Sequence, residues 1–287
     1  MDIKTYFPKG ILKDFVDSIV FISGRGGGTG IAFPRMNQTI IINMGDNFLV
    51  SAIYDKAPRI NECRDTIWIN GKQEIPFMLE NKGVTGMYAI GVKLGMLPFF
   101  ADLPAYTTND LAVGAEHWTS KDIFDIREQL HDAGSIDEGF GLIERYFTRL
   151  LIKKDLAAFQ KVRWLGKTMA SSTVEEICRA LGATRKKLRS EALIYFGGSV
   201  KNIQGIVRFN ETLAGIAKNA HQTLSSVHQY YDQSHFINDF KARAGITPLQ
   251  YRRLCRAFPQ IKYTPNFLSM ERETFLQFIS SRPGYLA

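Results

Sequence analysis

The sequence contains only three cysteines, Cys63, Cys178 and Cys255, and no two of them form a Cys-x-x-Cys pair. Three separated thiols argue against a disulfide framework and are typical of a reducing, cytoplasmic setting. No run of about 18 apolar residues is present, so no membrane-spanning helix is predicted. The first residues also lack the basic and then apolar pattern of a secretion signal. With 45% hydrophobic and 22% charged residues, the composition predicts a folded, soluble protein.

Histidine is also scarce, because only five occur and none precedes His117. A His-x-His metal site therefore cannot form in the first part of the chain, and no His-Glu-x-x-His or Gly-x-Ser-x-Gly motif occurs anywhere. The glycine-rich run at 24–30 is not followed by Gly-Lys-Ser/Thr, which favours a flexible hairpin loop over a phosphate-binding loop. We expect no cofactor, no metal site and no enzyme, with catalysis in the N-terminal part as a minor alternative.

Positive charge is concentrated in the C-terminal part of the chain. Residues 164–287 hold 17 lysines and arginines against 8 acidic residues, whereas residues 1–163 hold 19 against 20. This asymmetry accounts for the net charge of +8 and indicates an anionic partner for the C-terminal part, nucleic acid ahead of membrane. The alternative is a solvated basic surface without a partner.

The distribution of apolar residues along the chain predicts an α+β protein, in which a β-rich domain (a barrel or sandwich) at residues 1–118 precedes helices. Apolar and β-branched runs between turn residues predict strands at 19–22, 40–42, 48–50, 67–69 and 88–92. One helical piece is expected near Leu12–Ile19. Seven aromatic residues of this domain either line a ligand pocket or, as is commoner, form the core: Phe33, Phe48, Trp68, Phe77, Tyr88, Phe99 and Phe100.

Helical periodicity begins near Ser120, so residues 119–163 are interpreted as a helical connector, followed by a helical domain at 164–256 and a tail at 257–287. A helical piece is expected around 269–279 within this tail. Two connector helices are expected, one through Ile123 to Leu130 and one through Phe140 to Leu151. They could pack on the β-rich domain, connect it to the next domain, or form a dimer seam.

A helix-turn-helix pattern begins at Thr173. Thr173 and Glu176 form a capping-box pattern, and Gly182 interrupts the helix before a second helix that Thr184 can cap. That second helix carries cations in its first turns, around one inward Leu188. Such a leading end can enter a major groove and donate to guanine edges or phosphates. Taken alone, the pattern also fits a lysine-rich surface hairpin.

The same pattern occurs again downstream. A helix is predicted from Leu224 and a second one from Asp232, which is suited to an N-cap and is followed by inward-facing Phe236 and Phe240. Gly245 ends it, and Thr247-Pro248 begins a last helix. A connecting helix at 200–213 joins the two patterns, so two helix-turn-helix units are predicted.

The string Tyr230-Tyr231-Asp232-Gln233-Ser234-His235-Phe236, followed by Phe240-Lys241, Gly245-Ile246-Thr247-Pro248 and Tyr251-Arg252, resembles the DNA-binding domain of the AraC/XylS transcription regulators. The N-terminal part resembles the sensor domain of one branch of that family. The resemblance implies a seven-helix domain that places two recognition helices in successive major-groove segments of one DNA face. It implies the following DNA contacts: Arg185, Lys186, Lys187, Arg189 and Ser190 in the first unit, and Gln233, Ser234, Ile237 and Asn238 in the second, with Lys241 near the phosphates.

The chain departs from the family pattern at several positions. Ser190 and Asn238 stand where the family usually has arginine, which removes strong bidentate donors, although an asparagine can read adenine. Ala192 replaces an aromatic residue, and Gln229 replaces a glycine at a turn, which should cost on the order of 1 kcal/mol. The operator sequence therefore does not follow from the family.

The sequence thus predicts a cytoplasmic DNA-binding transcription regulator whose N-terminal domain senses a small-molecule effector or mediates dimerisation. The resemblance implies double-stranded DNA as a partner and makes a homodimer and contact with RNA polymerase further expectations, with no membrane partner. The alternative is a degenerate helix-turn-helix protein that acts through protein–protein interaction rather than operator binding. Cys178 is interpreted as a packing residue.

Overall fold

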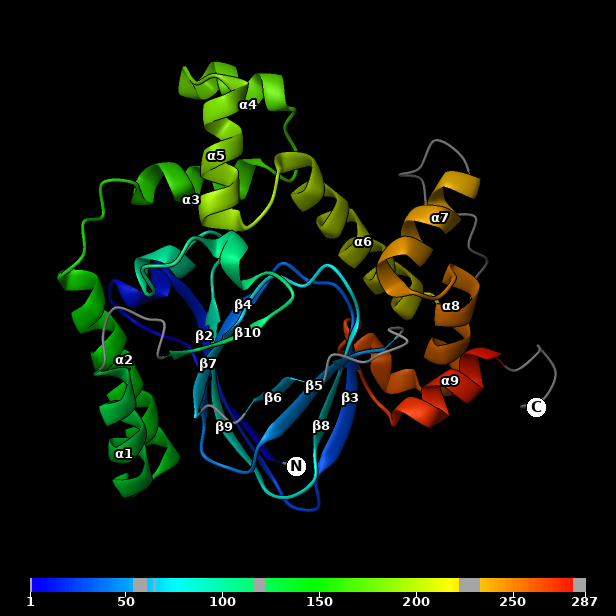
Figure 1. The fold of residues 1–287 in the computed structure, drawn as a ribbon, viewed down its shortest axis with the longest axis horizontal. Coiled ribbons are helices and arrows are strands. Elements are labelled where there is room, and N and C mark those ends of the chain that lie inside the picture. Colours follow the sequence, from blue (N-terminus) through cyan, green and yellow to red (C-terminus); the bar gives the residue numbers. More distant parts are fainter. Residues whose placement is uncertain (1, 54–60, 64–65, 116–121, 222–232, 281–287) are drawn as a thin grey trace.

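The computed structural model describes residues 2–53, 61–63, 66–115, 122–221 and 233–280, and it combines two sheets with a set of helices (Figure 1). The strands belong mostly to the N-terminal part and the helices to the C-terminal part, so the α+β prediction is confirmed. No helix in these ranges is long and apolar enough to cross a membrane.

The strands form two antiparallel sheets. The first sheet contains β1 (Asp2–Tyr6), β2 (Val16–Gly24), β9 (Thr85–Val92), β4 (Gln38–Asn43), β7 (Ile67–Asn70) and β10 (Ala112–Gly114), in that order. The second sheet contains β11 (Phe267–Ser269), β3 (Gly28–Ala32), β8 (Phe77–Asn81), β5 (Phe48–Ala52) and β6 (Asn61–Cys63). All five strand segments predicted from the sequence lie within these strands.

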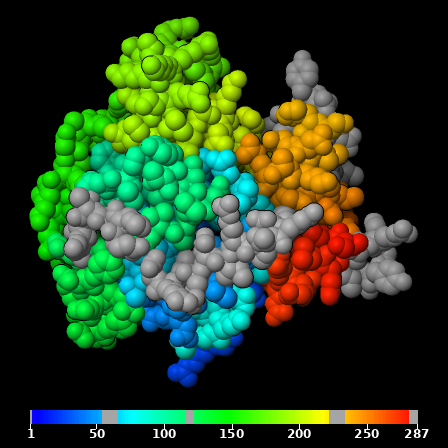
Figure 2. Space-filling view, in the orientation of Figure 1, coloured from blue at the N-terminus to red at the C-terminus, as the bar shows by residue number. Residues whose placement is uncertain are grey.

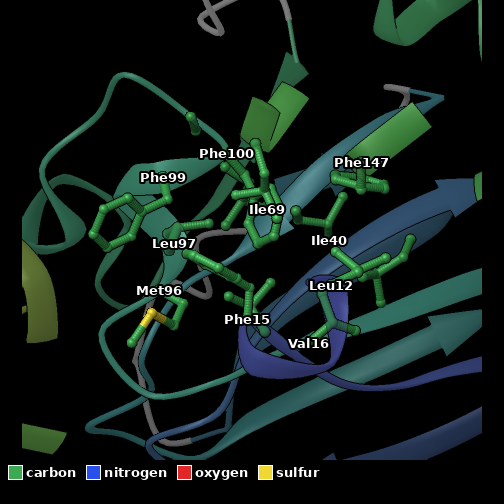
Figure 3. Packing of buried hydrophobic residues seen from close by; sticks show 14 of the residues in the cluster. Leu12, Phe15, Val16, Ile40, Ile69, Met96, Leu97, Phe99, Phe100 and Phe147 are labelled. Atoms are coloured by element: carbon green, nitrogen blue, oxygen red, sulfur yellow. The ribbon is translucent and has the colours of Figure 1, made fainter. Parts of the chain in front are cut away.

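Side-chain alternation on β4 explains how the first sheet is covered on both faces. Ile40 and Ile42 are fully buried in a cluster that includes Phe147 of the helix α2 (Ile136–Ile152). Ile41 points the other way and packs with Trp68 against residues of the second sheet. The aromatic and aliphatic side chains of the first cluster are shown in Figure 3.

The helices follow the strands along the chain. The α-helices are α1 (Ile123–Asp132), α2 (Ile136–Ile152), α3 (Phe159–Thr168), α4 (Val174–Leu181), α5 (Arg185–Phe196), α6 (Val200–Lys218), α7 (Gln233–Ala244), α8 (Pro248–Ala257) and α9 (Arg272–Ser280). The short 3-10 helices are η1 (Leu12–Asp14), η2 (Leu97–Phe99), η3 (Ala105–Thr108) and η6 (Pro259–Lys262). The helices α1 and α2 bear out the two connector helices expected from the sequence, and α6 bears out the connecting helix.

The helix expected near Leu12–Ile19 is largely wrong. Only η1 is helical, and from Val16 the chain is strand β2, which pairs with β1 on one side and β9 on the other. A register irregularity between Val16 and Ser18 shifts the alternation. The apolar spacing of Leu12, Val16 and Ile19 therefore mimics a helix, whereas hydrogen bonding on both sides of the strand determines the structure.

The glycine-rich segment is also not the hairpin that the sequence predicts. Strand β2 belongs to the first sheet and β3 to the second, so the turn between them crosses from one sheet to the other. Gly26 and Gly27 adopt positive φ angles there, at 93° and 71°. A Cβ atom on Gly27 would lie 2.4 Å from the carbonyl oxygen of Asn81, so the turn requires glycine for space as well as for conformation.

The C-terminal tail returns to the second sheet. Strand β11 pairs antiparallel with β3, and the backbone N–H of Phe33 donates to the carbonyl of Asn266 over 2.8 Å. Helix α9 packs beside this strand and buries Phe275 completely. A helical piece was expected at 269–279, whereas the strand that precedes it was not.

Each half of the helical part shares a hydrophobic cluster with a different sheet. One cluster joins residues of the first sheet with Leu188 and Phe196 of α5. The other joins Phe33, next to the second sheet, with Phe240 of α7 and Leu254 of α8. Helix α6 contributes residues to both clusters and therefore connects the two halves.

Candidate nucleic-acid interface

The first helix-turn-helix unit consists of α4, the turn at Gly182 and α5. The backbone N–H of Thr173 donates to Glu176 Oε2 over 2.8 Å, and the N–H of Glu176 donates to Thr173 Oγ1 over 3.2 Å, which confirms the predicted capping box. The backbone N–H and the hydroxyl of Thr173 both donate to the Glu176 carboxylate and hold its pKa below its ordinary value. Gly182 ends α4 with φ of 57°, and the Thr184 side chain accepts from the N–H of Lys187 at the start of α5.

The leading end of α5 is cationic and exposed. All five residues to which the sequence assigned DNA contacts in this unit are exposed: Arg185, Lys186, Lys187, Arg189 and Ser190. Leu188 is buried below them, as predicted. Because the helix N-terminus carries a partial positive charge as well, this end of α5 attracts anions.

Arg185 has an acidic partner that the sequence analysis did not identify. Its Nη2 lies 2.5 Å from Glu175 Oε1 on α4, and both side chains are largely exposed to solvent. The signal was present in the sequence as an acidic first turn of α4 opposite a basic first turn of α5. Within the described residues, Lys186, Lys187 and Arg189 form no ion pair, so these three cations remain available.

The opposite end of α5 packs on the N-terminal part. Phe196 is buried, and Tyr195 stacks on Phe99 of η2 with ring centroids 6.0 Å apart. Glu191 forms an ion pair with Lys161 of α3 over 2.6 Å. The cationic end of α5 therefore points away from the sheets, and Figure 1 shows α4 on the far side of α5 from them.

The second unit is described from Gln233 onward. The predicted helix at Leu224, the Asp232 cap, Gln229 and the side chain of Gln233 lie outside the described residues. Within α7, Phe236 and Phe240 are buried as predicted. Gly245 has φ of 72°, and Thr247 and Gln250 form a second capping box at the start of α8, where burial also raises the pKa of Tyr251.

The exposed face of α7 differs in chemistry from that of α5. Ser234 and Asn238 are exposed, and so is Lys241 one turn further on. Ile237 is half-buried against the cluster of the second unit, so it faces the helix packing as well as solvent. The available groups on this face are hydroxyl, amide and one ammonium. Such groups can donate to and accept from base edges or phosphates.

Both units lie at the surface of the molecule. The space-filling view shows the first unit at the top and the second at the right (Figure 2). Helix α6 runs between them, and its 19 residues make it about 28 Å long. The departure residues Ser190 and Ala192 differ in burial, since Ser190 is exposed and Ala192 is fully buried. A small residue at position 192 therefore fits the packing of α5.

The seven aromatic residues considered for a ligand pocket do not gather at one place. Tyr88, Phe99 and Phe100 belong to the cluster of the first sheet, Phe33 to that of the second unit, and Trp68 with Phe48 to the space between the sheets. Phe77 is half-buried on β8. Cys178 is partly buried against the first cluster, which supports its interpretation as a packing residue. No group of three or more potential metal ligands occurs among the described residues.

Comparisons with known proteins give matches in structure alone. No protein-family model matches the chain, and no curated protein does. Matching solved structures include ToxT from Vibrio cholerae, at 12% identity and a TM-score of 0.40, over 82% of this chain and 98% of that one.

Two further matches are ToxT with bound small molecules. ToxT from Vibrio cholerae bound to (E)-4-(8-methylnaphthalen-1-yl)but-3-enoic acid matches at 15% identity and a TM-score of 0.41, over 82% of this chain and 99% of that one. Wild-type ToxT from Vibrio cholerae with bound unsaturated fatty acid matches at 14% identity and a TM-score of 0.39, over 81% of this chain and 94% of that one. The proposals below rest on this chain's own residues and not on these matches.

Proposed function

We propose that this chain is a sequence-specific DNA-binding transcription regulator of the AraC type, with α5 and α7 in neighbouring major-groove segments. The observation that carries the proposal is the leading end of α5, where Lys186, Lys187 and Arg189 are exposed, lack ion-pair partners among the described residues and point away from the sheets. A helix end of this kind fits the width of the major groove and neutralises phosphates.

The second unit supports the same function through a different set of groups. Ser234, Asn238 and Lys241 are exposed along α7, at the opposite end of α6 from the first unit. Successive major-groove segments on one face of DNA lie about 34 Å apart, which is comparable with the length of α6. The length of the connecting helix is therefore compatible with two units that occupy neighbouring groove segments.

The remaining assignments follow from this function. Residues 1–118 would sense a small-molecule effector or mediate dimerisation. Residues 119–163 would connect this part to the DNA-binding domain at 164–256, and residues 257–287 would form a tail beyond that domain. We extend the proposal to a cytoplasmic location, a homodimer and contact with RNA polymerase.

A protein-interaction module is the second candidate function. Ser190 is exposed where an arginine would contact DNA in the resembled family, and Arg185 is engaged by Glu175. These features reduce the number of strong donors on α5. Under this alternative, the basic face would bind an acidic protein surface, and DNA affinity would be weak and independent of sequence.

A DNA-binding titration with the full chain tests the proposal. Duplexes enriched by the protein from a random-sequence pool are labelled and titrated at two salt concentrations, with the wild type, Lys186→Ala, Gln233→Ala and Lys82→Ala. Lys82→Ala removes one exposed cation from the turn after β8 and is the matched control. We expect tight, salt-dependent binding that the first two variants weaken by at least tenfold and that the control retains. The protein-interaction alternative is favoured if enrichment yields no duplex that binds more tightly than random DNA. It is also favoured if Lys186→Ala and Gln233→Ala both bind as tightly as the wild type.

A further inference from the structure

The turn between α5 and α6 is attached to the N-terminal part by a closed ring of polar groups. Lys72 Nζ donates to Glu74 Oε1 over 2.5 Å and to Asn202 Oδ1 over 2.7 Å. Asn202 Nδ2 in turn donates to Glu74 Oε2 over 3.1 Å, which closes the ring. Lys72 and Glu74 follow strand β7, whereas Asn202 lies in the first turn of α6, so the ring joins residues that are far apart in the sequence.

Burial makes this ring unusual among the charged groups of the chain. Lys72 is fully buried, and the Glu74 side chain is about one-third exposed. A buried ammonium needs partners for its hydrogens, and the ring provides both a carboxylate and an amide oxygen. Hydrogen bonds depend on direction, so the ring is satisfied in only one relative placement of α6 and the segment after β7.

The glycines of the α5–α6 turn fit the ring closely. A Cβ atom on Gly198 would lie 2.5 Å from Asn202 Oδ1 and 2.7 Å from Lys72 Nζ. Gly197 has φ of 72° and its carbonyl accepts from Asn109 Nδ2 over 2.6 Å. The end of the first recognition helix is therefore held by side chains of the N-terminal part on two sides.

The N-terminal side of the ring is itself braced. Asp110 Oδ1 accepts from the backbone N–H of Glu74 over 2.6 Å, and the N–H of Asp110 donates to the carbonyl of Lys72 over 2.9 Å. The segment that carries the lysine and the glutamate is thus fixed to the segment after η3. A displacement of either segment would move the ring and with it the end of α5.

We propose that the ring of Lys72, Glu74 and Asn202 is a separable joint that positions the first helix-turn-helix unit, so that a rearrangement of the N-terminal part changes how α5 is presented to DNA. When the joint opens, all three groups regain water, whereas separation of the apolar cluster that contains Phe196 and Val200 would expose buried side chains. The ring can therefore open locally while that cluster stays packed, which loosens the α5–α6 turn without unfolding either part. The role in DNA presentation rests on the proposed function, whereas the joint itself does not.

An exchange of side-chain types across the ring tests the joint. Asn202→Asp places a carboxylate next to Glu74, and Glu74→Gln places an amide next to that of Asn202, so each single variant should open the ring. The double variant Glu74→Gln with Asn202→Asp restores one cation, one carboxylate and one amide. Glu144→Gln is the control, because Glu144 accepts from Tyr6 Oη over 2.5 Å between β1 and α2, away from α5.

Amide hydrogen exchange of the full chain gives the first measurement. In each single variant we expect exchange at 72–75 and 197–203 to rise at least tenfold over the wild type, with the strands unchanged. The double variant should return to within threefold, and the control should leave both segments unchanged. The proposed joint is contradicted if exchange is unchanged at both segments or rises uniformly over the chain. It is also contradicted if the double variant does not recover. If one single variant fails to fold, the other and the double variant still decide the matter.

DNA titration of the same variants gives the second measurement. Because a loosened α5 must be ordered on binding, we expect the dissociation constant to rise at least threefold in each single variant and to recover in the double variant. Unchanged or tighter binding by an opened variant would overturn the positioning role. If the wild type itself binds no DNA, the proposed function fails, and the exchange measurement alone decides whether the joint exists.

Discussion

The two helices proposed to enter the DNA grooves, α5 and α7, expose different chemistry. On α5 the leading residues include Lys186, Lys187 and Arg189, whereas α7 exposes Ser234 and Asn238. Cations bind phosphates regardless of sequence, while hydroxyl and amide groups distinguish base edges. Under the proposed function, we therefore expect the first unit to contribute mainly affinity and the second to contribute base selection.

The units also differ in how they are attached. The first unit is held by the polar ring at Asn202 and by Phe196, next to the first sheet. The second unit is held by aromatic packing around Phe240 and by strand β11, which extends the second sheet. We expect the two units to respond separately to substitutions, because each shares its core with a different sheet.

The largest expected effect is on the second unit alone. Phe240 is fully buried, with ring centroids 5.3 Å from Phe209 and 5.9 Å from Tyr251. Phe240→Ala should lower the free energy of unfolding by about 3–5 kcal/mol because it leaves a cavity. Hydrogen exchange should show lost protection in α7 and α8 and retained protection in α4 and α5. Equal loss in both units would contradict separate attachment.

A smaller effect is expected where the tail crosses the second sheet. A Cβ atom on Gly30 would lie 2.1 Å from the ring of Phe267. Gly30→Ala should lower the free energy of unfolding by only about 1 kcal/mol, because the far end of the exposed Phe267 side chain can move aside. The double variant with Phe267→Ala should recover part of that loss, as measured by denaturant unfolding. A larger loss of stability in the double variant would show that the contact with the Phe267 side chain does not limit the size of the residue at position 30.

The two capping boxes offer a comparison in which pH is the variable. Thr247→Ala should lower the free energy of unfolding by about 1 kcal/mol at any pH, because Gln250 does not titrate. In the first unit, Glu176 has a lower pKa in the folded chain than in the unfolded chain. Its carboxylate therefore stabilises the fold at pH values above its unfolded pKa, and this stability is lost as the pH falls through its folded pKa. The effect of Thr173→Ala should therefore shrink in acid. Urea unfolding at neutral and acidic pH measures both variants, and parallel behaviour would contradict the assignment.

The smallest effect concerns the thiols of the two units. Burial raises the pKa of Cys255 to about 11, so very little thiolate forms at pH 8. Cys178 is only partly buried in the first unit. Alkylation followed by peptide mass spectrometry should label Cys178 well before Cys255 in the native chain. Equal labelling rates would indicate that the second unit opens as readily as the first.

Local signals made much of the helical part predictable. Thr173 with Glu176, Gly182 and Thr247-Pro248 each act within one turn of chain, and each is confirmed. The outward placement of Lys186 and Lys187 also followed from a single inward Leu188. Gln233 stays a prediction, because its side chain lies outside the described residues.

Long-range contacts made the rest unpredictable. Nothing near Lys72 indicates that it is buried, because its partner Asn202 lies in another element. Strand β11 is short and forms only where β3 offers an edge. The run from Leu12 to Ile19 was misread as helical, because pairing with two neighbouring strands outweighs apolar spacing.

The salt dependence of DNA binding tests the division between the units most directly. The double variant Lys186→Ala with Lys187→Ala should lower the slope of log affinity against log salt by about 0.9 per lost phosphate contact, with base preference retained. The double variant Ser234→Ala with Asn238→Ala should keep the slope and relax the base preference, as read from pools of enriched duplexes. If both double variants change slope and preference alike, or if neither changes them, the division between an affinity unit and a selecting unit is wrong.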